Sequence, residues 1–433
     1  MLPMLLLMQA PALEITNLKS GDVLRSSVVV VRGQAPDGKV EISREGGPRM
    51  TFEAVGGTFA APVELKPGLN TVKVSAGGKT QTRSITWKPA QSAYKVRVVY
   101  LQASDEPAPA IMELPGTAKA DVIARTSTAA KLMQGFCEDH FRAAGQADRT
   151  FTMDYLSNGQ VRVDFVTLKE TGDSLRAKDG NRLWSQFYGE LSKIYDFDRE
   201  KILAIMGFTR YDAATQKSTG HTALGGGSLG LFGSGSMRYW PKSVEDSFKA
   251  FHDVTLVDPK VSFDDSGLRF RAWANASTTI GAMMHEMGHT FGLPHTIDNR
   301  CIMSRGFDQF GSALFGTEPR TDGRVVARVG SYWDPVHSAR LNLNPYFHAD
   351  RQIDPKPIVP EINRSGDKII LSAEGGLRLI SVWQDNKPSW SQSLVGESAE
   401  FSLANLRRKI SGNQIHVVAV SASGGERTQR FDN

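Results

Sequence analysis

Three histidines stand close together in the stretch HEMGHTFGLPH, which covers residues 285–295. His285 and His289 are four residues apart, so on a helix both imidazoles project from one face. Gly292 permits the positive φ of a sharp turn, after which His295 can approach the first two histidines. Three neutral imidazoles that leave a fourth position open are a ligand set of catalytic zinc. The sequence therefore predicts one catalytic Zn2+ ion held by these three histidines.

Glu286 follows the first of these histidines and would project beside the same site. A carboxylate in that position can take a proton from a water molecule that the metal ion acidifies. The alternative is a helix whose histidines only bond to backbone groups, but the complete HExxHxxGxxH spacing rarely arises by chance. We therefore expect Glu286 to act as the general base of a hydrolase.

Met303 lies eight residues after the third histidine, in the segment CIMSRGFD at 301–308. Its position resembles the Met-turn of the metzincin zinc peptidases, in which a methionine forms an apolar floor beneath the metal. The alternative for a lone methionine is ordinary core packing. We expect Met303 to have a structural role.

A glycine-rich block at 220–235 precedes the histidine stretch. Three of its glycines match the GxGxxG spacing of dinucleotide-binding loops, but no apolar strand leads into the block and no long helix can follow it. The remaining alternatives are a surface loop and an edge strand of a cleft, where glycine lets a substrate backbone approach and pair. We expect the edge strand. The candidate cleft residues are Gly225, Gly226, Gly227 and Leu229.

Three blocks of the chain resemble a family of zinc metallopeptidases known from fungi and also found in bacteria. They are ADVIARTSTAAKLMQGFCEDHF at 120–141, ALGGGSLGLFGSGSMRYWP at 223–241 and TTIGAMMHEMGHTFGLPHTIDNRCIMSRGFD at 278–308. The third block is the most specific, and the resemblance covers roughly residues 94–350. It implies a metzincin-like peptidase and leaves the substrate unidentified.

The rest of the chain predicts the elements that must position these residues. Residues 13–90 contain short β-rich runs separated by Pro/Gly turns, which favours an immunoglobulin-like sandwich. Residues 94–350 mix strands with helices, among them helices over 119–144 and 181–195, and form the metzincin-like catalytic domain. Thr278 and Thr279 are the expected caps of the zinc helix. Residues 355–433 return to β patterns. The fold class is therefore α+β, a metzincin-like zinc peptidase domain flanked by N-terminal and C-terminal all-β (immunoglobulin-like) sandwich domains.

Composition and charge narrow the possible partners and location. The 433 residues carry a formal net charge of +5 and no basic stripe, so we expect no nucleic-acid partner. The apolar run at 2–8 is too short to cross a bilayer, and no transmembrane segment is expected. Residues 1–12 resemble the core and cleavage site of a signal peptide, although no basic residue precedes the core. We expect a secreted, periplasmic or cell-surface monomer, with a cytoplasmic location still open.

The function that these residues favour is a zinc-dependent endopeptidase acting on a protein or peptide substrate. One alternative is a zinc hydrolase of non-protein amides such as cell-wall peptides, and another is a non-catalytic, zinc-stabilised binding or adhesion protein. His221 and His252 are outside candidates for supporting the metal ligands, and Asp298 either orients His295 or forms a turn. Cys137 and Cys301 are either bridged or two buried thiols.

Overall fold

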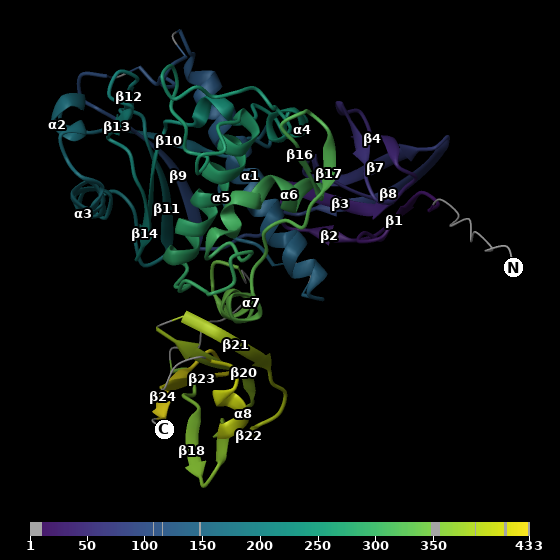
Figure 1. The fold of residues 1–433 in the computed structure, drawn as a ribbon, viewed down its shortest axis with the longest axis vertical. Helices are drawn as coiled ribbons and strands as arrows, with labels where there is room; N and C mark the ends of the chain where they lie inside the picture. Colours follow the sequence, from purple (N-terminus) through teal and green to yellow (C-terminus); the bar gives the residue numbers. More distant parts are fainter. Residues whose placement is uncertain are drawn as a thin grey trace, which may run out of the picture.

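The computed structural model describes residues 11–106, 108–114, 116–146, 149–347, 356–385, 387–410 and 414–431. Its elements form an N-terminal β unit, a central α/β unit and a C-terminal β lobe (Figure 1). Most of the predicted signal segment lies outside the described residues. Within the described part of the chain, no helix is both long enough and apolar enough to cross a membrane.

Two sheets make up the N-terminal unit. One has the order β1-β3-β6 and the other the order β2-β8-β7-β4-β5, with β2 parallel to β8. Alternating apolar residues, as in RMTFEA of β5, place one face of each strand in the core. An immunoglobulin-like identity for this unit stays a prediction. The strands are β1 (Glu14–Ile15), β2 (Val23–Leu24), β3 (Val28–Gln34), β4 (Gly38–Arg44), β5 (Arg49–Ala54), β6 (Thr58–Glu64), β7 (Gly68–Ala76) and β8 (Lys79–Trp87).

A five-stranded sheet of order β10-β9-β11-β15-β14 forms the middle layer of the central unit. Four strands are parallel, and β14 pairs antiparallel with β15 at the edge. β11 reads EKILAIM and is buried on both faces, as expected for a parallel strand with helices on each side. The strands are β9 (Lys95–Gln102), β10 (Val163–Thr167), β11 (Glu200–Met206), β14 (Ala223–Gly226) and β15 (Leu229–Gly233).

Helices cover both faces of this sheet. α3 (Gly180–Leu191) packs its buried Leu183 and Phe187 against one face. The other face shares a core with α1 (Lys119–Ala143) and α5 (Ala272–Thr290), which lies at the centre of the molecule (Figure 1). The expected helices are confirmed, and so is the mixture of α and β structure. The shorter elements are α2 (Gly172–Arg176), β12 (Arg210–Asp212), β13 (Lys217–Thr219), η1 (Met237–Tyr239), α4 (Ser247–Phe251), η2 (Arg305–Gln309), α6 (Phe310–Phe315), β16 (Thr317–Pro319), β17 (Val325–Ala327) and α7 (Pro335–Leu343).

The prediction that Thr278 and Thr279 cap the zinc helix was wrong. α5 begins at Ala272, so both threonines lie within the helix and are only 7% and 8% exposed. The hydroxyl of Thr278 donates to the Asp308 carboxylate at 3.0 Å. The Thr279 hydroxyl donates to the Asn275 carbonyl, one helical turn earlier, at 2.6 Å. It also accepts a hydrogen bond from the Trp240 indole at 2.8 Å. These bonds satisfy two polar groups that would otherwise disfavour burial inside a helix.

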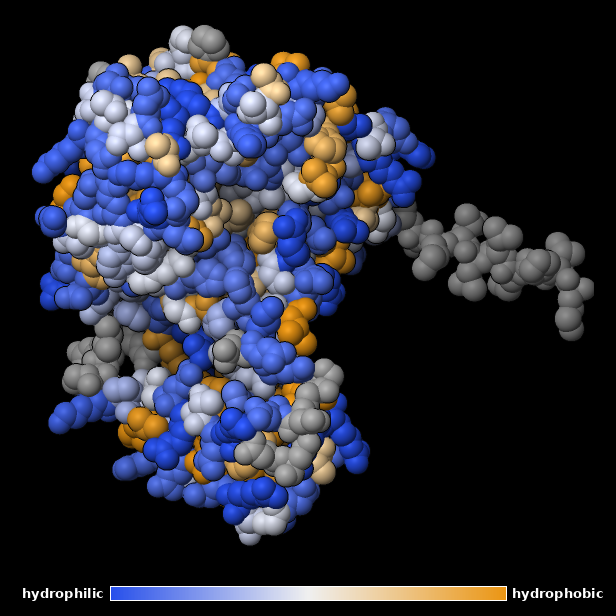
Figure 2. Space-filling model, turned by 60° about the vertical axis from the view of Figure 1, so that its left-hand side comes forward, coloured by the Kyte–Doolittle hydropathy of each residue, from blue (hydrophilic) through white to orange (hydrophobic). Residues whose placement is uncertain are grey.

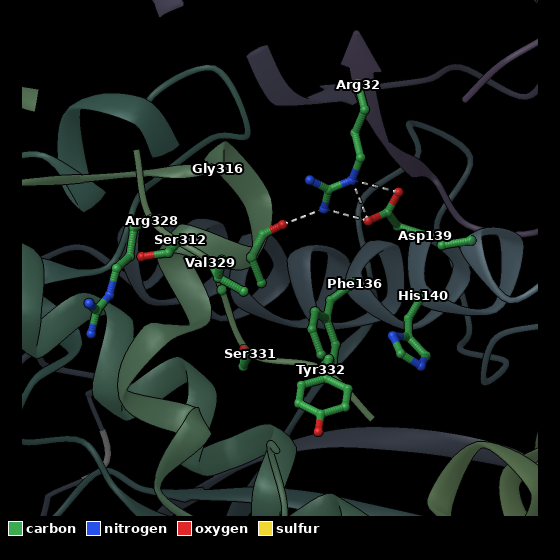
Figure 3. Close-up of a pocket in the computed structure, with 13 residues that line it drawn as sticks. Arg32, Phe136, Asp139, His140, Ser312, Gly316, Arg328, Val329, Ser331 and Tyr332 are labelled. Atoms are coloured by element: carbon green, nitrogen blue, oxygen red, sulfur yellow. Dashed lines mark hydrogen bonds and ion pairs between the residues drawn. The ribbon is translucent and has the colours of Figure 1, made fainter. Parts of the chain in front are cut away.

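The N-terminal unit and the central unit share one continuous hydrophobic core. α1 joins them: the buried Glu138 carboxylate accepts hydrogen bonds from the backbone amides of Arg25 and Ser26, at 2.9 and 2.7 Å. Arg32 of β3 pairs with Asp139 of α1 at 2.6 Å, and both line a cavity of about 310 Å³ at this junction (Figure 3). The first β unit is thus an integral part of the scaffold that holds α5.

The C-terminal strands form a lobe below the rest of the molecule (Figure 1), and hydrophilic residues cover most of the face of the lobe that Figure 2 displays. Its sheets have the orders β18-β19-β22 and β21-β20-β23-β24 around a separate core. α7 attaches the lobe through Val336 and Ala339, which pack on Leu379 and Val420. The elements are β18 (Glu361–Ser365), β19 (Lys368–Ser372), β20 (Leu377–Gln384), β21 (Lys387–Ser393), β22 (Ser398–Ser402), α8 (Leu403–Arg407), β23 (Ile415–Ser421) and β24 (Glu426–Phe431).

Candidate metal centre

The three histidines of the predicted metal site come together at the end of α5. His285 and His289 are one turn apart on the helix, which ends at Thr290. Gly292 follows with a φ of +80°, and the backbone amide of Leu293 returns to the Gly288 carbonyl at 3.0 Å. This tight turn is the reason for glycine at 292, because other residues disfavour that φ. It brings His295 back beneath the helix, so the local spacing is enough to assemble the cluster.

The geometry of the cluster fits a zinc ion. The three Nε2 atoms are 3.1 to 3.2 Å from one another. Tetrahedral ligands at the usual zinc–nitrogen distance lie about 3.3 Å apart. The carbonyls of Ile302 and Leu293 lie 2.8 and 2.9 Å from Nδ1 of His285 and His289. A carbonyl can only accept, so each Nδ1 carries the proton and each Nε2 lone pair is free for a metal.

Burial keeps the ligands neutral. It lowers the pKa of all three histidines, and that of His285 to about 3. The positive charge of Lys387, in β21 of the C-terminal lobe, further lowers the pKa of His295. Neutral imidazoles present lone pairs to a cation at physiological pH, whereas imidazolium would repel it. The site is therefore ready to bind a metal ion near pH 7.

Glu286 lies beside the cluster and against the edge strand. Burial raises the pKa of its carboxyl to about 7, and a hydrogen bond from the backbone amide of Gly225 opposes that rise. A carboxyl with a pKa near the working pH can both accept and return a proton. Gly225 belongs to β14, so the edge strand holds the carboxylate through its backbone.

Gly225 of the 220–235 block serves close packing, which the sequence did not indicate. A Cβ at residue 225 would lie less than 3.0 Å from the backbone of Glu286, so β14 can only pack on α5 with glycine there. Gly226 has room, since its nearest neighbour would be Trp184 at 3.7 Å. Gly227 has a φ of +53° and begins the turn to β15. Leu229 was wrongly predicted to face a cleft: it is fully buried under α3.

Met303 is fully buried against the zinc helix. Its Sδ atom occupies the space beside Gly288, which lies between the two helical ligands, and a Cβ at residue 288 would overlap it. The Met303 carbonyl accepts the backbone amide of Thr296 at 3.2 Å, next to the third ligand. The residue thus packs under both halves of the histidine stretch.

Other sequence candidates lie elsewhere. His252 contacts the Phe248 carbonyl and the Thr317 hydroxyl, and His221 faces Asp265, so the polar partners of both lie away from the three clustered histidines. Asp298 accepts the Tyr332 hydroxyl and the Arg300 amide, so it anchors its own loop.

Both cysteines are free, buried thiols. The sulfur of Cys137 lies 3.8 Å from Met284 Sδ, and the sulfur of Cys301 lies 3.4 Å from His337 Nδ1. Sequence reasoning missed this second contact and the role of Asp334. The signal available was the Asp-Pro start of a helix at 334–335, where Asp334 caps α7 by accepting the His337 amide at 3.0 Å.

Comparisons with known proteins place the site in a family context. A family model described as "Putative peptidase family" matches residues 12–370. A Schizosaccharomyces pombe protein named "Putative zinc metalloproteinase" is 25% identical over 415 residues, which cover 86% of this chain and 66% of that protein. A Saccharomyces cerevisiae protein of the same description is 24% identical over 386 residues, covering 77% and 55%. This chain therefore spans only about half to two thirds of the length of these relatives.

A solved structure shares the fold. The crystal structure of wild-type OgpA from Akkermansia muciniphila is 18% identical, with a TM-score of 0.51, and the match covers 79% of this chain and 93% of that one. The family match begins at residue 12, so the resemblance reaches much further than the predicted 94–350 and includes the N-terminal β unit. This agrees with the shared core, in which that unit supports the peptidase fold.

Proposed function

The chain belongs to that family of peptidases, and from this premise we propose that it is a zinc-dependent endopeptidase with one catalytic zinc ion. The observation that carries the proposal is the convergence of three histidine Nε2 atoms within 3.2 Å of one another, beside the half-buried Glu286. The names of the two yeast relatives support zinc as the metal. The donor set supports it independently, because three imidazoles with an open position suit catalytic zinc.

The proposed chemistry divides between the ion and the chain. His285, His289 and His295 would hold the zinc ion, which would supply a Lewis acid for the scissile carbonyl and for water. Glu286 takes a proton from the attacking water and returns it to the leaving amine. The Gly225 amide fixes the carboxylate, while the carbonyls of Ile302 and Leu293 orient two of the imidazole rings.

The substrate is proposed to be a protein or peptide in extended conformation. β14 is the last strand of the central sheet, and among the described residues no strand pairs with its outer edge. A free strand edge next to the general base can pair with a peptide backbone by strand addition. We also propose that the protein is exported, on the strength of the apolar N-terminal segment.

The test compares the zinc-loaded protein with Glu286→Gln on an unbiased peptide mixture, read by mass spectrometry. Cuts made by the wild type and abolished by a chelator are expected, with a loss of at least about a hundredfold in the variant. Zinc content is measured in both proteins, because the substitution should leave the three ligands intact. Equal cutting by both proteins would refute the mechanism. Cleavage of muropeptide-like amides in place of peptides would change the substrate class.

A further inference from the structure

A second cluster of metal-ligating side chains lies apart from the three catalytic histidines. It consists of Cys301, at the start of the loop that carries Met303, and of Asp334 and His337, at the first turn of α7. Their exposed fractions are 0%, 8% and 0%. The ligand atoms of all three residues lie within 4.8 Å of one another. The burial of a thiol, a carboxylate and an imidazole side by side calls for a physical explanation, because such groups are rarely buried together.

We propose that Cys301, Asp334 and His337 bind a second zinc ion, which has a structural role. Cysteine sulfur, imidazole nitrogen and carboxylate oxygen are all zinc ligands. The proposal goes beyond the catalytic site and does not depend on it. On binding, the Cys301 thiol releases its proton to solvent, so the ion is held by a thiolate, a carboxylate and a neutral imidazole.

The distances from His337 fit a shared ion. Nδ1 of His337 lies 3.4 Å from the Cys301 sulfur and 3.4 Å from Oδ1 of Asp334. In a tetrahedral zinc site, sulfur and nitrogen ligands lie about 3.5 Å apart, and nitrogen and oxygen about 3.3 Å. One imidazole nitrogen has either a proton or a lone pair, so it cannot make a good hydrogen bond to a thiol donor and a carboxylate acceptor together. A cation between the three atoms satisfies all of them.

The charge of the buried Asp334 carboxylate also favours a bound cation. The Asp334 carboxylate is buried, and within the described ranges no lysine or arginine forms an ion pair with it. A buried carboxylate without a compensating cation is costly. A divalent ion balances the charges of the carboxylate and the thiolate. Asp334 also keeps its second function, because the same oxygen Oδ1 accepts the His337 backbone amide at the start of α7.

A fourth ligand is available as water. Asp334 lines a cavity of about 220 Å³ that continues along Thr296 and along Pro388 and Trp390 of β21. This volume holds several water molecules, and its walls include hydroxyl and carboxylate groups that can bond to them. A water in this cavity next to Asp334 would complete a four-coordinate sphere around the ion.

The second ion would stabilise the loop segment that orients His285. Cys301 immediately precedes Ile302, whose carbonyl accepts the Nδ1–H of His285 and whose amide donates to the Tyr332 carbonyl at 2.9 Å. Fixing Cys301 to α7 therefore fixes the carbonyl that orients one catalytic ligand. It also ties α7, which carries the C-terminal lobe, to the loop beneath the zinc helix.

Cobalt substitution tests the proposal, because a thiolate bound to Co2+ gives a charge-transfer band in the near ultraviolet that imidazole and carboxylate ligands do not give. The full chain is stripped of metal, reloaded with Co2+ under reducing conditions and analysed for metal content. The wild type should show the band and bind two ions per chain. Cys301→Ser should lose the band and one ion. Cys137→Ser is the matched control: it removes the other buried thiol and should keep both.

Two further variants separate this proposal from the catalytic one. His289→Ala removes a ligand of the first site, so it should lose one ion and keep the thiolate band. His337→Gln should lose the band, and it replaces Cys301→Ser if that variant does not fold. Wild type that binds one ion and shows no band would overturn the proposal, as would a band that persists in Cys301→Ser. In either case the cluster is a metal-free hydrogen-bonded group, and the proposed peptidase mechanism is unaffected.

Discussion

Gly225 and Glu286 touch through their backbones at the point where the edge strand crosses the zinc helix. A Cβ at residue 225 would come within 3.0 Å of three backbone atoms of Glu286, and backbone cannot move aside as a flexible side chain can. The amide of the same glycine also donates to the Glu286 carboxylate. The position of Glu286 therefore depends on the absence of a side chain at residue 225 in the neighbouring strand.

Gly225→Ala should accordingly impair both stability and catalysis. The added methyl group forces β14 away from α5, with an expected loss of about 1–3 kcal/mol in the free energy of unfolding. Peptide hydrolysis should fall further than the folded fraction does. The displaced strand moves the Gly225 amide away from the Glu286 carboxylate, which then loses this hydrogen bond. Urea unfolding and peptide turnover measure the two effects. Gly226→Ala is the control: its Cβ would meet only Trp184 at an ordinary 3.7 Å, so both properties should change little.

The link between the N-terminal unit and α1 gives a second prediction. Glu138 is buried and accepts two backbone amides from the loop before β3. Glu138→Gln keeps the shape but turns one acceptor into a donor that faces an N–H group, so we expect a loss of about 1–3 kcal/mol. Because the two units share a core, denaturation should remain one transition at a lower denaturant concentration.

Glu41→Gln provides the comparison for that variant. Glu41 pairs with Lys39 and Arg49 on the exposed side of the N-terminal sheet, where ion pairs contribute little. Its unfolding midpoint should stay close to that of the wild type. A Glu138→Gln protein in which the N-terminal unit unfolds separately would contradict the shared core.

Acid sensitivity gives a third prediction, at His252. Burial lowers the pKa of this imidazole to about 4, although the Phe248 carbonyl partly offsets the effect. The unfolded chain binds a proton near the ordinary value of about 6.5, so this contribution to stability is complete above that pH and is lost as the pH falls toward 4. Its full size is on the order of 3 kcal/mol.

His252→Gln should therefore flatten the decline of stability between about pH 6.5 and 4 relative to the wild type. Both proteins are measured in a chelator, so that loss of metal from the catalytic histidines at low pH contributes to neither curve. Parallel curves for the two proteins would mean that folding does not lower the pKa of His252.

The clustering of the three histidines could be predicted from the sequence because its parts are local. The three histidines lie within eleven residues, and Gly292 at a positive φ supplies the only sharp turn between them. The same reasoning failed where a distant partner decides the outcome. Thr278 was taken for a helix cap, but its hydrogen-bond partner, Asp308, lies 30 residues further along the chain, in η2.

Long-range contacts also explain the rest of what was missed. The glycine at 225 was assigned to substrate access, whereas the helix backbone that requires it lies 61 residues further along the chain. Cys301 and His337 meet only because α7 returns beneath the loop, which no local pattern indicates. The N-terminal strands were predicted to form a separate domain. The sequence does not show the contacts that join them to α1, which are the hydrogen bond of Glu138 to the Arg25 amide and the ion pair of Arg32 with Asp139.

The packing of Met303 on Gly288 yields a prediction that separates a structural role from a catalytic one. A methyl group at residue 288 would overlap Met303 Sδ, which lies beside Gly288. In the wild-type background, Gly288→Ala should reduce the free energy of unfolding by about 1–3 kcal/mol through overpacking. In a Met303→Ala background the same change should stabilise by about 1 kcal/mol, because it fills part of the cavity and alanine favours a helix. Unfolding of the zinc-free proteins in urea gives the coupling energy, and zinc binding by the four proteins shows whether the overlap reaches the ligands. Additive effects would mean that Met303 is not packed on the zinc helix.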